Sequence, residues 1–224
     1  MKKLLQGIVD FRKELTPESR AIFAKLALGQ KPDALFIGCS DSRVAPNVFA
    51  STNPGDLFVL RNIGNLVPPA SPSLEENSVA AAIEFSVNSL NVSDIIVCGH
   101  SECGAIEALV QGANSECCSH LNSWLTHASN SLKTFRNGVT LNPHLSEVNQ
   151  ISQLNVLEQM KHIATYPCVQ ERLKSKQIQI HGWWFDIAQA DVYCYEQSIN
   201  QYVLIDELEA KLIFDRLASK RPQS

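Results

Sequence analysis

The chain has 224 residues, 45% of them hydrophobic, which is enough for one large globular domain with its own core. Its formal net charge is −4 and its lysines and arginines form no cluster, so the sequence offers no electrostatic basis for binding nucleic acid. No apolar run approaches the roughly 18 residues that a membrane span requires. We therefore expect neither nucleic acid nor a membrane as a partner.

The seven cysteines are an odd number, and charged residues from Asp10 to Glu14 interrupt the N-terminus before a signal peptide could form. An odd count without a secretion signal argues against a disulfide framework and favours a reducing compartment. We therefore expect a cytoplasmic protein whose thiols are free to bind metal.

The N-terminal 30 residues predict a helical arm. Apolar residues recur at helical spacing over residues 3–13, and a second helix is expected to begin at Thr16, as its N-cap, and Pro17, and to stop at Gly29. Such an arm packs either on a partner subunit or on its own domain, and the sequence favours neither.

Continuous apolar runs at residues 34–37, 56–62 and 94–98 are typical of strands buried on both faces. The segments 78–90 and 103–110 between and after them have helical periodicity. Strands that alternate with helices predict a parallel sheet with right-handed crossovers.

The remainder is expected to be mostly helical from residue 119 to 174, with a strand at 177–187, short strands at 192–195 and 202–205, and a closing helix at 207–217. The predicted fold class is α/β: a mainly parallel central sheet flanked by helices, with an N-terminal helical arm and a helical C-terminal half. No linker divides the chain, so a single domain over residues 1–224 is the simplest prediction.

Metal-ligand residue types follow two of the predicted strands. Cys39 and Asp41 come after the first, and His100 and Cys103 come after the third. Zinc prefers two thiolates and an imidazole, with a carboxylate or a water in the fourth position. Because sites in parallel sheets form at the carboxyl ends of strands, we expect these four residues to meet and to hold one zinc ion per chain.

Asp41 has two possible roles. It could bind the metal and close the site, or it could turn away and hold a metal-bound water. Arg43 lies two residues further on, so in extended backbone its guanidinium can form a bidentate pair with that carboxylate. Such a pair keeps Asp41 ionised and makes it less available to zinc, which favours the second role.

The ligand set has an electrostatic consequence. Two thiolates neutralise the formal charge of Zn²⁺, so this site should be a weaker Lewis acid than one built from three neutral histidines. We therefore predict that the bound water ionises on the alkaline side and that activity rises with pH.

Other chemistry-bearing residues have structural interpretations. Cys98, Cys168 and Cys194 lie in apolar patterns and are expected in the core, and Cys117 with Cys118 is not expected to form a second metal site. His181 is expected to be a hydrogen-bonded structural histidine. The remaining assignments are solvated helix positions for His127, His144 and His162, and core or subunit interface for Trp183 and Trp184.

The two metal-ligand turns resemble those of the β-class carbonic anhydrases. The matching motifs are Cys39-Ser40-Asp41-Ser42-Arg43 and Gly99-His100-Ser101-Glu102-Cys103-Gly104. The resemblance covers most of residues 20 to 190 and includes Gly29-Gln30-Lys31-Pro32, Pro54-Gly55-Asp56-Leu57-Phe58, Arg61-Asn62-Ile63-Gly64-Asn65, Ala82-Ile83-Glu84-Phe85 and His181-Gly182-Trp183. Within the family, the likeness is greatest to the bacterial form associated with cyanate degradation.

The resemblance implies reversible hydration of CO₂ to bicarbonate and a proton, with zinc held by Cys39, His100 and Cys103 and a catalytic dyad of Asp41 and Arg43. It also implies a substrate pocket. In this pocket Gln30 would orient CO₂, and the backbone N–H of Gly104 would hold it. The apolar wall would consist of Phe58, Ile63 and Phe85. Family members are dimers or higher assemblies whose N-terminal helices embrace the partner, so a homodimer or a dimer of dimers is expected.

Some members of the family have a closed state with bicarbonate at a regulatory site built from Trp, Arg and Tyr. The matching positions here are Phe36, Arg61 and Phe185, so only the arginine is present. The resemblance therefore implies an open site at neutral pH without regulation by bicarbonate.

Two alternatives to CO₂ hydration stay open. The same fold and zinc could hydrolyse CS₂ or COS, which are also linear electrophiles. A non-catalytic zinc protein with all four ligands closed is the second alternative, and Arg43 argues against it because a structural Asp ligand does not need that competitor.

Overall fold

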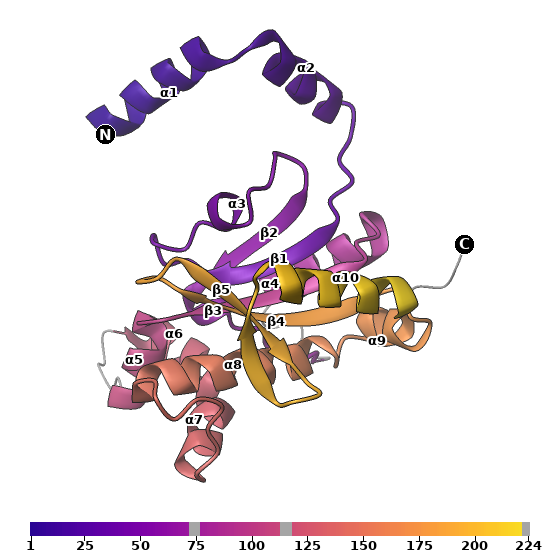
Figure 1. Ribbon diagram of the computed structural model, residues 1–224. Helices are drawn as coiled ribbons and strands as arrows, with labels where there is room; N and C mark the ends of the chain where they lie inside the picture. Colours follow the sequence, from indigo (N-terminus) through magenta and orange to yellow (C-terminus); the bar gives the residue numbers. More distant parts are fainter. Residues whose placement is uncertain (72–76, 113–117, 221–224) are drawn as a thin grey trace. The chain divides into compact units, whose positions relative to one another are not determined.

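The computed structural model describes residues 1–71, 77–112 and 118–220. Its first 31 residues form one compact unit, and the chain from Pro32 onward forms a second, larger one. Figure 1 labels the helices and strands of both units.

The N-terminal unit consists of α1 (Lys2–Glu14) and α2 (Pro17–Leu26), as the sequence predicted. The Thr16 side chain accepts a hydrogen bond from the Ser19 backbone N–H at 3.1 Å, which is the expected N-cap. The Phe11 and Phe23 rings meet edge to face with their centroids 6.1 Å apart. Neither helix has a buried residue. The single-domain organisation and the packing of the arm stay predictions.

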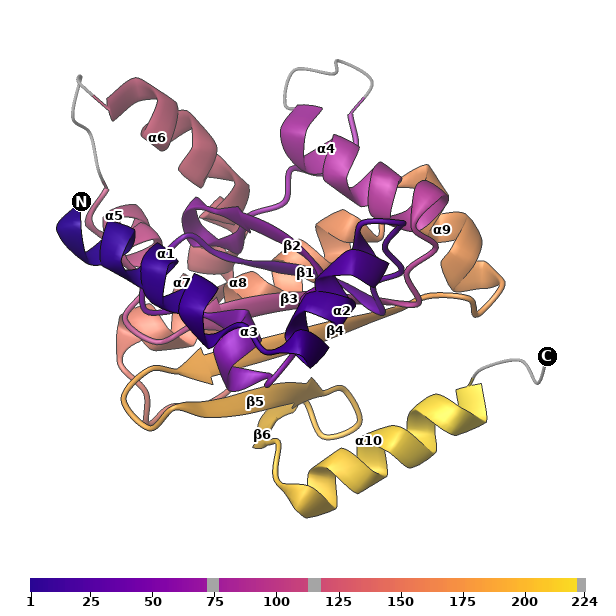
Figure 2. The same ribbon diagram turned by 90° about the horizontal axis from the view of Figure 1, so that it is seen from above.

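The larger unit is organised around a six-stranded sheet of order β2-β1-β3-β4-β5-β6. The strands are β1 (Ala34–Cys39), β2 (Leu57–Asn62), β3 (Asp94–His100), β4 (Gln179–Asp186), β5 (Asp191–Glu196) and β6 (Gln201–Leu204). The first four pair in parallel, and β4, β5 and β6 pair antiparallel. β6 and α10 (Glu207–Lys220) lie at the edge of the sheet remote from β2 (Figure 2).

Helices connect and cover the strands, and the predicted α/β fold class is confirmed. The longest is α8 (Glu147–Ile163), which runs beneath the sheet in Figure 1 and packs on β3 and β4. The others in this unit are α3 (Pro46–Phe49), η1 (Ile63–Asn65), α4 (Asn77–Glu84), η2 (Phe85–Ser89), α5 (Gly104–Gln111), α6 (Ser119–Leu125), η4 (Thr126–Ala128), α7 (Ser129–Arg136) and α9 (Pro167–Lys174).

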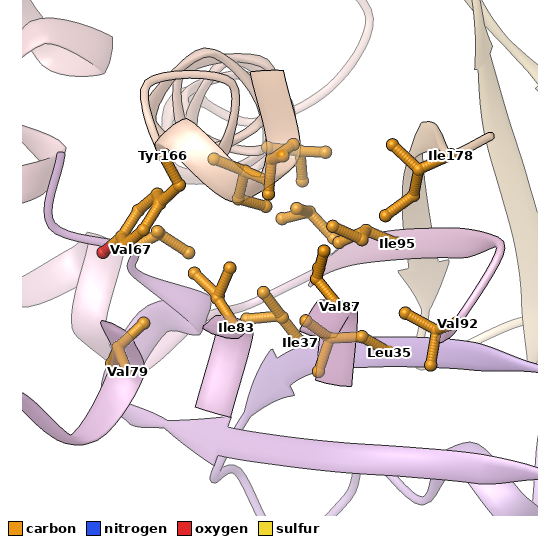
Figure 3. Close-up of a cluster of buried hydrophobic side chains, with 14 residues drawn as sticks. Leu35, Ile37, Val67, Val79, Ile83, Val87, Val92, Ile95, Tyr166 and Ile178 are labelled. Carbon is orange, nitrogen blue, oxygen red and sulfur yellow. The ribbon is translucent and has the colours of Figure 1, made fainter. Parts of the chain in front are cut away.

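Alternate residues of β1 and β3 enter two different apolar clusters, as strands buried on both faces require. On one face, Leu35, Ile37, Ile95 and Val97 pack against α4, η2, α8 and α9 (Figure 3). On the other face, a smaller cluster contains Phe36, Ile96 and Cys98. Each fully buried side chain of this size contributes roughly 1.5–3 kcal/mol to folding.

The segment predicted as one helix over residues 78–90 departs from a regular α-helix in its second half. The α-helix ends at Glu84 and continues as a π-turn, η2, in which the Leu90 N–H donates to the Phe85 carbonyl. The buried Ser86 hydroxyl donates to the Ile83 carbonyl at 2.9 Å. That bond gives an upstream carbonyl an alternative partner, which is a recognised cause of local helix distortion.

Close packing of α8 on β3 predicts a stability effect at Gly99. A Cβ at this position would lie 2.7 Å from Val156 Cγ2 and 3.3 Å from the Ser152 carbonyl oxygen. We expect Gly99→Ala to lower the free energy of unfolding by about 1–3 kcal/mol, the usual cost of overpacking. Denaturant unfolding of the metal-free protein measures it. Gly7→Ala in α1, where a Cβ would meet nothing within 4 Å, is the control, and an equal loss in both would contradict the packing argument.

Candidate metal centre

The sheet brings the two ligand-bearing turns together. β1 and β3 are neighbouring parallel strands in a register that sets Gly38 opposite Cys98. Their carboxyl ends therefore lie side by side, and Cys39 ends one strand while His100 ends the other. The chain then turns through Glu102, whose φ of 52° is left-handed, to Cys103 at the start of α5.

Three of the four predicted ligands form a cluster. The Sγ atoms of Cys39 and Cys103 and a ring nitrogen of His100 lie within 4.8 Å of one another. All three residues are buried, with exposed fractions of 4%, 1% and 0%. Among the described residues, no second group of three or more potential metal ligands lies this close together.

The orientation of His100 suits a metal ligand. Its Nδ1 lies 2.8 Å from the Ser101 carbonyl oxygen, which can only accept, so Nδ1 carries the proton. The other nitrogen, Nε2, is buried and has no hydrogen-bond partner among the described residues. A buried ring nitrogen with a lone pair and no donor is costly unless it binds something. Two sulfurs and this nitrogen are the donor set that zinc prefers, so the residues present fit that metal.

The Cys39 and Cys103 thiols are hydrogen-bonded to each other, and Cys39 is also hydrogen-bonded to Gly64. In the chain without metal, a hydrogen bond from Cys103 lowers the pKa of Cys39, and the same pairing raises the pKa of Cys103, so the pair shares a proton. The Cys39 Sγ also accepts a hydrogen bond from the Gly64 N–H at 3.4 Å. A divalent metal held by this pair would take the place of the shared proton, because thiolates are the ligand form.

The fourth predicted ligand, Asp41, is held by Arg43 and is not a member of the cluster. Arg43 Nε and Nη2 donate to the two carboxylate oxygens at 2.9 and 2.7 Å, and the Arg43 N–H adds a third bond at 2.9 Å. Arg43 Nη2 also donates to the Glu102 carbonyl at 3.0 Å, which ties the two turns together. The Arg43 guanidinium holds the pKa of Asp41 well below its usual range, so this carboxylate is ionised at neutral pH.

Arg61 has a structural task that the sequence did not reveal. Its guanidinium donates to the carbonyls of Cys39, Asp41 and Val44 at 3.0, 2.7 and 2.7 Å. These three bonds hold the backbone of the turn that follows β1. Phe49 stacks on Phe185 at 4.7 Å between centroids and lies 6.1 Å from Phe36, so aromatic rings pack at the two positions matched to the family's regulatory Trp and Tyr. The sequence could not reveal these contacts, because they join residues from separate segments of the chain.

The predicted pocket residues are brought together only in part. Phe58 and Phe85 face each other with centroids 5.8 Å apart, and Phe85 and Ile63 are 47% and 46% exposed. Gly104 is the first residue of α5, and a Cβ there would meet nothing within 4 Å, so its backbone is open to approach. Gln30 belongs to the N-terminal unit, and its role stays a prediction.

Several other interpretations are tested by the structure. Cys98 and Cys194 are buried and Cys168 packs against the larger cluster, as expected. His181 lies 2.9 Å from Asp94, which confirms a structural histidine. His162 is not a solvated residue, because its ring is mostly buried with Nδ1 2.7 Å from the Val67 carbonyl. Cys117 lies outside the described residues.

The fold and the site define a class of protein: an α/β protein with a Cys-His-Cys centre at the carboxyl edge of a parallel sheet. Comparison with known proteins identifies the family. The family described as carbonic anhydrase matches residues 34–192. A carbonic anhydrase of Pseudomonas aeruginosa is 35% identical over 210 residues, which cover 92% of this chain and 93% of that protein.

Solved structures agree. The β-carbonic anhydrase CcaA superposes with a TM-score of 0.84 at 33% identity and covers 92% of both chains. One of two tetrameric β-carbonic anhydrases from Sordaria macrospora has a TM-score of 0.74 at 30% identity, covering 86% of this chain and 95% of its own. The chain therefore belongs to the β-class carbonic anhydrases and is an enzyme of that family, as the sequence motifs predicted.

None of the helices in the described part of the chain combines the length and the hydropathy needed to cross a membrane.

Proposed function

We propose that this enzyme catalyses the reversible hydration of CO₂ to bicarbonate and a proton, with one zinc ion held by Cys39, His100 and Cys103. The observation that carries the proposal is the buried three-residue cluster with the unpartnered Nε2 of His100. The engagement of Asp41 by Arg43 supports a centre whose fourth position is left for water. Zinc at this centre would act as a Lewis acid that lowers the pKa of a coordinated water.

Asp41 and Arg43 are proposed as the catalytic dyad. Arg43 keeps the Asp41 carboxylate ionised and orients it through two side-chain bonds and one backbone bond. Two of these bonds go to Oδ1, so Oδ2 is the oxygen that keeps a lone pair to accept a further hydrogen bond. An ionised acceptor beside the centre orients the attacking water toward the carbon of CO₂. Because an ionised carboxylate can only accept hydrogen bonds, any molecule that binds to Asp41 must donate one to it.

The substrate needs an apolar wall, because CO₂ is a nonpolar gas. Phe58, Ile63 and Phe85 are proposed to provide it, and the contact of Phe58 with Phe85 beside exposed ring surface supports this role. The Gly104 N–H, at the open start of α5, is proposed to hold the oxygen of the substrate, and Gln30 to orient it.

We also infer a homodimer or a dimer of dimers. The tetrameric relatives support this inference, and so do the exposed apolar residues of the N-terminal unit, which include Leu4, Leu5, Ile8 and Phe11. The association with cyanate degradation and the cytoplasmic location stay predictions from the sequence. A site that is not regulated by bicarbonate is supported by the phenylalanines at positions 36 and 185.

The first test is the rate of CO₂ hydration against pH by stopped flow, with zinc content assayed on the same sample. We expect one zinc per chain and a rate that rises through an alkaline pKa, because two thiolates weaken the Lewis acid. Asp41 does not titrate in that range, since Arg43 holds its pKa well below the usual value, so the ionisation belongs to the water.

Full zinc occupancy with no hydration at any pH would overturn the proposal. CS₂ and COS would then be assayed as substrates on the same preparation. Absence of activity toward all three would leave the closed, non-catalytic zinc protein.

A further inference from the structure

The helix α8 carries a row of buried polar residues that the proposed chemistry does not use. Asn149, Ser152, Asn155 and Gln159 are 8%, 2%, 1% and 0% exposed. Their spacing of three and four residues places them along one side of the helix. A buried polar group without a hydrogen-bond partner lowers the stability of the fold by about 1–3 kcal/mol, so each of these side chains needs a partner.

Asn149 holds the turn between His100 and Cys103. Its Oδ1 accepts a hydrogen bond from the Glu102 N–H at 2.7 Å, and its Nδ2 donates to the Glu102 carboxylate at 2.9 Å. Glu102 is the residue with left-handed backbone, a conformation that costs free energy for a residue with a side chain. Asn149 therefore stabilises the bend that presents Cys103.

Ser152 holds the backbone of His100 itself. Its hydroxyl donates to the His100 carbonyl at 2.8 Å and accepts a bond from Trp184 Nε1 at 3.2 Å. The tryptophan, 2% exposed in β4, thereby orients the hydroxyl toward the ligand strand.

Asn155 is connected to Cys39 through Gly64. Its Nδ2 donates to the Gly64 carbonyl at 3.1 Å, and its Oδ1 accepts from Gln159 Nε2 at 2.8 Å. Gly64 has φ of 77°, and its N–H is the group that points at Cys39 Sγ. By holding the Gly64 carbonyl, Asn155 anchors the residue whose N–H the Cys39 sulfur accepts.

We propose that Asn149, Ser152 and Asn155 are positioning residues that form one rigid template for the metal centre. Successive turns of a single helix contact the backbone beside Cys103, at His100, and at the hydrogen-bond donor to Cys39. Leucine or alanine would fill the same space without a buried polar group, so packing alone does not explain these residues. The proposal rests on the metal site proposed above and adds how that site is kept in shape before metal arrives.

The test uses Co²⁺ as the probe, since its visible absorption reports the geometry of thiolate ligation. Affinity is measured by competition with a chelator, and the spectrum of the saturated protein is recorded for Asn155→Leu and Ser152→Ala. We expect about 10–100-fold weaker Co²⁺ binding in each, the usual effect of losing an outer partner of a ligand. We also expect a shifted thiolate-to-cobalt band in Asn155→Leu, because Gly64, which donates to the Cys39 sulfur, loses one of the bonds that anchor it.

Gln153→Met is the matched control. Gln153 is a buried amide of the same helix, 2% exposed; within the described residues its Oε1 has no partner, and its side chain makes no hydrogen bond to a ligand turn. This variant is expected to bind Co²⁺ as the parent does. If Asn155→Leu does not fold, Ser152→Ala, a smaller change, decides the question by its affinity.

Two results would count against the template itself. Parental affinity and spectrum in both folded variants would overturn it, and so would an equal loss in Gln153→Met, which would indicate general softening of α8. Failure of the unsubstituted protein to bind Co²⁺ at all would instead overturn the metal site on which the template rests.

Discussion

Cys39→Ser is expected to produce a folded protein that retains almost no zinc and hydrates CO₂ no faster than buffer. The substitution keeps the shape of the side chain but replaces a soft thiolate with a smaller hydroxyl, which is a poor ligand for zinc. Structural zinc sites bind with about 10–16 kcal/mol, so losing one of three protein ligands should weaken binding by on the order of 1,000-fold or more. Zinc content after dialysis and stopped-flow hydration measure the two effects.

Cys98→Ser separates ligation from burial. Cys98 lies on the same sheet as Cys39, is fully buried and is not in the ligand cluster. Burial raises the pKa of its thiol, so it behaves as a core side chain and not as a thiolate. We expect this variant to lose stability by about 1–3 kcal/mol while it keeps its zinc. Equal loss of zinc in both variants would refute the assignment of Cys39 as a ligand.

Asp41→Asn should have the second largest effect, and it should act on rate without removing the metal. The amide preserves the shape of the side chain but lacks the negative charge that pairs with Arg43. Its NH₂ group is a donor and replaces one of the two carboxylate oxygens, both of which accept hydrogen bonds from Arg43. General acid–base and orienting groups contribute about 10²–10⁴-fold, so a loss of rate in that range is expected at full zinc occupancy.

Arg43→Ala examines the same pair from the other side. Without the guanidinium, the pKa of Asp41 returns toward its ordinary range, and its carboxylate becomes available to the metal. We expect lower activity with zinc retained or held more tightly, measured by chelator competition. A non-catalytic scaffold would have no activity to lose, and an unchanged rate in both variants would contradict the dyad.

The sequence by itself determined the class of fold and the three candidate metal ligands that the structure brings together. Apolar runs such as residues 34–37 and 94–98 predict buried strands because burial on both faces removes polar positions from a segment. Cys39, His100 and Cys103 were found because parallel strands end at one edge, so two separate turns must meet there. Both inferences rest on local patterns plus one rule of topology.

Only the tertiary structure decided how the centre is supported. Asn155 and Gly64 are 91 residues apart, Asn149 and Glu102 are 47 apart, and Arg61 reaches the Cys39 turn from another strand. In the sequence, the polar residues of α8 read as an ordinary helix, because periodicity reports which side of a helix is apolar and not what a buried amide will bond. Hydrogen bonds between distant segments depend on the exact placement of both backbones, which exists only after the sheet and α8 have packed.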